Sequence, residues 1–162
     1  MEFSLRGMRP DDIEGKAYVH WKSWQEAYTG LVDQSYLDAL SVERSVERAH
    51  HWPDNTLVAE EDGKIVGFAC YGVCRNEDLT DCGEVYAIYV LEAYQKHKIG
   101  YALMNACFER LTAYPKIAVW VLKGNEKAIR FYERYGFRFD GASAEITLCT
   151  PITELRMIFQ RI

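Results

Sequence analysis

Residues that could bind an anion follow an apolar stretch in the middle of the chain. Residues 85–91 are apolar or aromatic without strict alternation, which is typical of a strand covered on both faces. The polar turn 95–98 comes next, and a helical pattern begins near Gly100. Backbone N–H groups are unpaired in the first turn of a helix, and the helix dipole is positive there. The turn therefore predicts an anion site built from backbone groups.

Three side chains near these elements could move a proton or orient a ligand. Glu84 opens the apolar strand, and a carboxylate in such a place can act as a general base; the alternative is an ordinary glutamate at the strand rim. Asn125 and Tyr132 are seven positions apart, two turns along one face of a predicted helix. Their structural alternatives are that Asn125 only caps this helix and that Tyr132 only packs among neighbouring aromatic rings.

The elements that must position these residues can be read from hydrophobic periodicity and from turn residues. The pattern predicts strands at 2–9, 56–61, 65–74, 84–91, 117–122, 137–139 and 153–160, and helices at 12–28, from about Asp33 onward, at 100–112 and at 126–135. Residues 140–152 mix Gly, Ser and Thr and are left unassigned. The order predicts one mixed α/β domain over 1–162, with parallel strand pairing across the helix at 100–112.

Two motifs in this frame resemble the GNAT superfamily of acetyl-CoA-dependent N-acetyltransferases. Residues 95–100, Gln-Lys-His-Lys-Ile-Gly, resemble the family's Gln/Arg-x-x-Gly-x-Gly/Ala pyrophosphate loop, and 125–137 match Asn-x-x-Ala-x-x-Phe-Tyr-x-x-x-Gly-Phe in full. The resemblance is strong over 56–139 and rests on element order elsewhere. The loop departs from the family at Lys98, where the first glycine is expected. A residue with a side chain fits that position if its backbone φ is negative.

The resemblance implies a fold, a co-substrate and a set of site residues. The implied fold is α/β (α+β mixed), with a central mixed, mostly antiparallel sheet of six to seven strands, a parallel splayed pair and flanking helices. Tyr132 would protonate the departing thiolate of coenzyme A, and Glu84 would take a proton from the acceptor through water. Acetyl-CoA would bind to Ile88, Tyr89 and Val90, to the loop residues Gln95, Lys96, His97, Lys98, Ile99, Gly100 and Tyr101, and to Asn125.

The acceptor in such a protein is an amine, either a small molecule or an amine of a protein. In the helix at 12–28, Trp24 and Tyr28 could stack on a cationic amine, and Glu26 is a weaker base candidate. The alternative is that this aromatic stripe is simply core. Two other functions stay open at this point: a non-catalytic acyl-CoA-binding sensor module and a structural interaction domain.

Composition and cysteine spacing indicate which classes of partner and which cellular compartment to expect. The net charge of −5 argues against nucleic-acid and membrane partners. The start of the chain lacks an apolar leader, and the five cysteines have irregular spacing without a metal pattern. We therefore expect a cytoplasmic protein with free thiols and no metal, and the family resemblance allows a homodimer.

Overall fold

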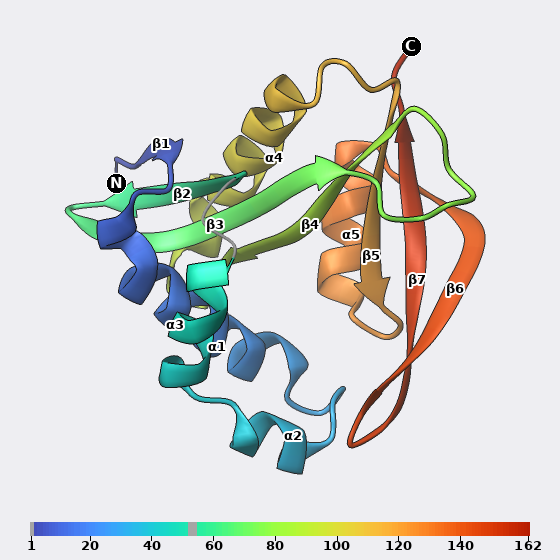
Figure 1. Ribbon diagram of the computed structural model, residues 1–162. Coiled ribbons are helices and arrows are strands. Elements are labelled where there is room, and N and C mark those ends of the chain that lie inside the picture. Colours follow the sequence, from blue (N-terminus) through green and yellow to red (C-terminus); the bar gives the residue numbers. More distant parts are fainter. Residues whose placement is uncertain (1, 52–54) are drawn as a thin grey trace.

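A computed structural model describes residues 2–51 and 55–162 and shows one seven-stranded sheet (Figure 1). The strands are β1 (Ser4–Gly7), β2 (Thr56–Glu61), β3 (Lys64–Val73), β4 (Cys82–Val90), β5 (Lys116–Leu122), β6 (Arg138–Leu148) and β7 (Thr150–Gln160). They lie in the order β1-β2-β3-β4-β5-β7-β6, and every neighbouring pair is antiparallel except β4 and β5. The predicted mixed, mostly antiparallel sheet with one parallel pair is confirmed.

Helices cover both faces of this sheet. They are α1 (Ile13–Tyr28), α2 (Gln34–Ala39), α3 (Val42–His51), α4 (Ile99–Arg110) and α5 (Glu126–Tyr135), with short 3-10 turns η1 (Pro10–Asp12) and η2 (Glu92–His97). The ammonium of Lys16 in α1 lies over the ring of Phe68, whereas the adjacent Gly67 faces Leu103 of α4. Because successive residues of a strand point to opposite faces, α1 and α4 lie on opposite faces of the sheet.

The main core lies between the sheet and the two helices α4 and α5. Leu103, Met104, Ile117 and Phe137 are among its fully buried side chains. Within the described parts of the chain, no helix is long and apolar enough to cross a membrane.

The largest difference from the sequence-based elements is at the C-terminal end. Residues 140–152, which had no assignment, belong to the long β6–β7 hairpin, and the strand predicted at 137–139 continues to Leu148. The hairpin turns at Cys149, which has a φ of 67°, and a register shift between Phe139 and Ser143 accommodates Gly141 at a φ of 90°. The bulge and the turn break the two-residue alternation by which a strand is recognised.

Candidate functional site

The site exists because β4 and β5 separate. Their parallel pairing covers only Cys82–Glu84 against 116–118 and ends at the pair Glu84 and Ala118. Beyond it, β4 continues to Val90 along β3 only, so its other edge is not covered by a strand. A cleft of about 1140 Å³ opens along this edge, between β4 and α5, and its walls include Tyr86, Ala87, Ile88, Tyr89, Val90, Trp120 and Leu122. An extended ligand can pair with such a free strand edge as an added strand would.

At one end of the cleft, the start of α4 offers free backbone donors. The first helical bond of α4 is from Ala102 N–H to the Lys98 carbonyl, 3.0 Å, so the N–H groups of Ile99, Gly100 and Tyr101 have no partner within the helix. Lys98 has φ 62° and ψ 20°, in the left-handed region. The sequence-based condition of a negative φ is therefore not met: the lysine adopts the conformation for which glycine is favoured, and α4 still begins directly after it.

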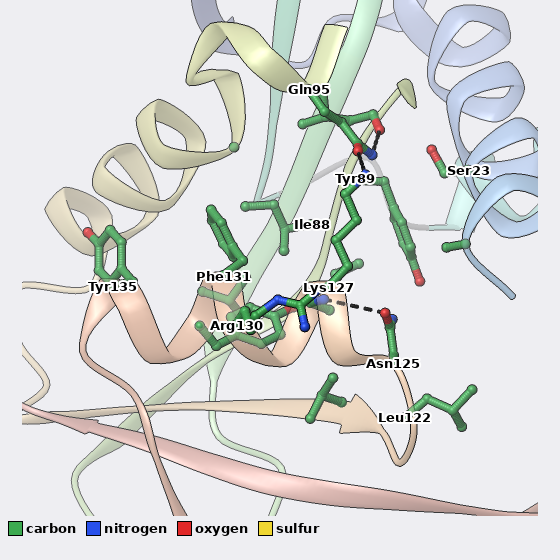
Figure 2. Close-up of a pocket in the computed structure, with 18 of the residues that line it drawn as sticks. Ser23, Ile88, Tyr89, Gln95, Leu122, Asn125, Lys127, Arg130, Phe131 and Tyr135 are labelled. Atoms are coloured by element: carbon green, nitrogen blue, oxygen red, sulfur yellow. Dashed lines mark hydrogen bonds between the residues drawn. The ribbon is translucent and has the colours of Figure 1, made fainter. Parts of the chain in front are cut away.

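In the part of the chain that the structure describes, five cations line the cleft. Lys127, Arg130 and Arg134 belong to α5 at spacings of three and four, and Lys96 and Lys98 belong to the loop. Figure 2 shows Lys127 and Arg130 on α5. Glu26 and Glu92 are the only acidic residues among the described lining residues. A chain with a net charge of −5 thus presents a locally positive cleft, which suits a polyanionic ligand.

Hydrogen bonds fix the loop that carries part of this charge. The side chain of Gln95 donates to the Val90 carbonyl, 2.9 Å, and accepts a hydrogen bond from the Lys127 ammonium. Asn125 caps α5 by accepting from Ala128 N–H, 3.4 Å, and also lines the cleft. The capping role of Asn125 is thus present, and its position leaves a ligand role open.

Three tyrosines of the cleft wall, Tyr28, Tyr89 and Tyr132, form a cluster. The hydroxyl groups of Tyr28 and Tyr89 are 3.2 Å apart, and Tyr132 lies near them on α5 with 9% of its surface exposed. Burial is the main cause that raises the pKa of each of these three tyrosines above its ordinary value. All three are therefore protonated at neutral pH. One hydroxyl of the Tyr28–Tyr89 pair uses its proton in the bond between them, which leaves the other hydroxyl and that of Tyr132 able to donate to an anion.

Glu84 lies outside the residues that line the cleft. It is 1% exposed, and its two carboxylate oxygens accept from Arg75: the backbone N–H at 3.1 Å and the guanidinium at 2.7 Å. Burial is the main cause that raises the pKa of Glu154 in β7, and the nearby charge of Glu84 also raises it. Sequence reasoning did not single out Glu154, because only the pairing of β5 with β7 brings it to this end of the sheet.

The predicted acceptor residues divide into two groups. Glu26 and Tyr28 line the cleft, and a Glu26 carboxylate oxygen accepts from Glu92 N–H, 3.1 Å. Trp24 does not line it; its ring packs edge-on against Tyr28, with ring centroids 4.6 Å apart, and is tilted against Tyr36, with centroids 6.1 Å apart. Trp24 therefore packs against other aromatic rings, whereas Tyr28 lies at the cleft wall and its contact with an acceptor stays a prediction.

The cofactor residues also divide. His97 and Ile99 do not line the cleft, since His97 is exposed and Ile99 is fully buried, whereas the remaining nine predicted cofactor residues do line it. Sequence reasoning missed Ser23, Trp120 and the three cations of α5. Of these, only the cations had a local signal, the helical spacing of Lys127, Arg130 and Arg134.

Comparison with known proteins agrees with this geometry. The model of the acetyltransferase (GNAT) family matches residues 18–137. The chain is 32% identical over 139 residues to the uncharacterised N-acetyltransferase YuaI of Bacillus subtilis, with 82% of this chain and 78% of that protein covered. It is 29% identical over 150 residues to the probable N-acetyltransferase Rv2775 of Mycobacterium tuberculosis, covering 85% and 80%. The fold resembles that of a PaiA N-acetyltransferase from Thermoplasma acidophilum in complex with coenzyme A, with a TM-score of 0.77 at 18% identity and 99% of both chains covered.

Proposed function

Because the chain belongs to the GNAT acetyltransferase family, we propose that it moves an acetyl group from acetyl-CoA to an amine by direct attack in a ternary complex. One observation carries the proposal: the uncovered edge of β4, the free N–H groups of α4 and the cations of α5 line a single cleft. Family membership favours this enzyme over the non-catalytic sensor module.

The cleft suits each part of acetyl-CoA. The diphosphate binds the N–H groups at the start of α4 and the neighbouring lysines, because both supply positive charge at one point. The pantetheine arm lies along β4 and pairs with backbone groups of residues 88–90. The acetyl group then reaches the tyrosine cluster, where an N–H near Val90 stabilises the oxyanion of the tetrahedral intermediate.

The transfer step requires two proton movements. The neutral amine nitrogen attacks the thioester carbon, the C–S bond breaks with its electron pair on sulfur, and the nitrogen loses one proton as the amide forms. Tyr132 gives its phenolic proton to the thiolate of coenzyme A, and the proton lost by the nitrogen returns through water to the tyrosinate, which restores Tyr132. A pKa raised by burial makes Tyr132 a reluctant acid in the ground state but keeps its proton in place until the thiolate develops.

Deprotonation of the acceptor ammonium is assigned to Glu84, acting through water. Its pairing with Arg75 holds the carboxylate in one orientation. Glu26 at the cleft wall and Glu154 beside Glu84 are the competing bases. A pH profile of each glutamine variant distinguishes the three.

An acetyl-CoA consumption assay against a broad amine panel, with products identified by mass spectrometry, tests the proposal. We expect N-acetylated product from at least one amine and stoichiometric release of coenzyme A. Tight binding of acetyl-CoA with no transfer to any amine would contradict the enzyme and favour the sensor. No binding of acetyl-CoA at all would contradict both.

A further inference from the structure

A second, smaller cavity lies beside the cleft on the α1 face of the sheet. Its volume is about 190 Å³, and residues of α1, α3, β3 and β4 surround it. Tyr86 and Ala87 of β4 line both this cavity and the cleft, so the two spaces adjoin at these residues. The lining residues are Lys16, Ala17, His20, Ser45, Arg48, Phe68, Cys70, Arg75, Tyr86 and Ala87.

The lining of this cavity is cationic. Lys16, Arg48 and Arg75 line it, and no aspartate or glutamate does so among the described residues. Arg75 has Glu84 as its partner, whereas neither Lys16 nor Arg48 forms an ion pair with any described side chain. Two positive charges therefore face the cavity without a counter-charge from the described part of the chain.

Lys16 is the unusual member of this set. It is 8% exposed, and its ammonium lies 5.0 Å from the centroid of the Phe68 ring, which only partly replaces hydration. A buried ammonium normally has a carboxylate or several hydrogen-bond acceptors around it, because desolvation of a charge is costly. His20 does not supply a negative charge; burial, with the charges of Arg48 and Lys16, lowers its pKa to about 4. Its Nδ1 lies 3.1 Å from the hydroxyl of Ser45.

One face of α1 connects the cavity with the cleft. Lys16 and His20 line the cavity, and Ser23 and Ala27 line the cleft, at the spacings of four, three and four that place residues on one helical face. At 1.5 Å per residue, about 5–10 Å separates His20 from Ser23 and Ala27 along the axis. Among the described residues, the buried hydroxyl of Ser23 has no hydrogen-bond partner. An acceptor that spans this distance would pass Ser23.

We propose that this cavity holds a carboxylate of the acceptor, so that the substrate is a small amino acid whose reactive amine lies several bonds from its carboxylate. The inference rests on the proposed function and adds the substrate class. The carboxylate pairs with Lys16 and Arg48, and the chain runs past Ala87 and Ser23. The amine then reaches the tyrosine cluster in the cleft. The cavity volume accommodates a carboxylate and a few methylene groups, which favours a small molecule over a protein segment.

The test compares ω-amino acids of increasing chain length with their primary amides and with diamines of equal length. At the best length, kcat/KM for the amino acid should exceed that for its amide about ten- to a hundredfold, the range of a hydrogen-bonded charge pair. Lys16→Met keeps the length of the side chain without its charge and should remove most of this preference, because the acid loses a charge pair and the amide loses at most a hydrogen bond from the ammonium. Lys22→Met on the same helix lines neither space and is the matched control.

A second variant tests the inference if Lys16→Met does not fold, and a binding measurement tests it if no amine is acetylated. Arg48→Ala changes an exposed side chain on α3, so it should fold even if Lys16→Met does not, and it should lower the preference in the same direction. Amides or diamines that match the amino acid, or variants that lower the rates for acids and amides equally, would overturn the inference. If no amine is acetylated, the proposed function fails. Calorimetric titration of the ω-amino acid then decides the cavity, and equal affinity of wild type and Arg48→Ala would overturn it.

Discussion

Lys98 combines an unfavourable backbone conformation with a useful charge, and the two can be separated by substitution. Its φ of 62° is in the left-handed region, which costs an L-residue about 1–2 kcal/mol. Lys98→Ala keeps that cost and removes the ammonium, whereas Lys98→Gly removes both. Glycine also stabilises the unfolded chain by about 0.4–1 kcal/mol, because it has more conformational freedom there. The relief of the backbone cost exceeds this loss, so Lys98→Gly should be more stable than Lys98→Ala by roughly 1 kcal/mol. Urea unfolding followed by tryptophan fluorescence measures this difference.

The charge of the Lys98 ammonium should raise the affinity for acetyl-CoA. If one lysine–phosphate contact contributes about 1 kcal/mol, both variants should bind acetyl-CoA about fivefold more weakly than wild type at low salt. The loss should shrink as salt rises, and at moderate salt Lys98→Gly should bind no better than wild type. Calorimetry at two salt concentrations measures these affinities. A clear gain in affinity for Lys98→Gly alone would refute the reasoning, because it would show that backbone strain at Lys98 opposes ligand binding.

The remaining predictions concern protons. Tyr132→Phe keeps the ring but removes the donor, so steady-state assays should show kcat lower by about ten- to a thousandfold with nearly unchanged acetyl-CoA affinity; full activity would contradict the assignment. Glu84→Gln should shift the rising limb of the kcat/KM pH profile to higher pH, where the free amine itself is present, and an unmoved limb would direct attention to Glu26 or Glu154. Burial lowers the pKa of His20 from 6.5 in the unfolded chain to about 4 in the folded protein. The unfolded chain therefore binds a proton first as pH falls, so the contribution of His20 to the free energy of unfolding is complete above pH 6.5 and is lost as pH falls toward 4. This difference in pKa corresponds to about 3 kcal/mol of stability, and the free energy of unfolding of His20→Gln, measured against pH, should lack that loss. If the variant loses stability in acid as the wild type does, another group causes the acid sensitivity.

Local chemistry explains which elements could be predicted from the sequence. The bounds of α5 follow from the Asn125 cap and from Gly136 at its end, and both devices are present in the structure. The strand β4 and the turn before α4 follow equally from short patterns. The β6–β7 hairpin could not be recognised, because the bulge near Gly141 and the turn at Cys149 interrupt its alternation.

The residues of the site come together only in the folded sheet, and no short stretch of the sequence shows which side chains will meet there. Trp24 and Tyr28 are four apart on one helix, yet only Tyr28 lines the cleft. The approach of Glu154 to Glu84 depends on strands that are distant in the sequence and meet through β5. The conformation of Lys98 likewise follows from the geometry between η2 and α4, not from lysine's own preference.

The most direct test of the central claim places a negative charge where the diphosphate of acetyl-CoA should lie. A Cβ at Gly100 would meet the Phe131 ring at 3.4 Å, so the side chain of Gly100→Glu should turn toward the free N–H groups at the start of α4. Gly7→Glu, in open space on the edge strand β1, is the control for the added charge. In an acetyl-transfer assay with the best amine, Gly100→Glu should raise the KM for acetyl-CoA at least tenfold, while Gly7→Glu should leave it unchanged. A wild-type KM in Gly100→Glu would contradict the claim that acetyl-CoA binds along this helix start.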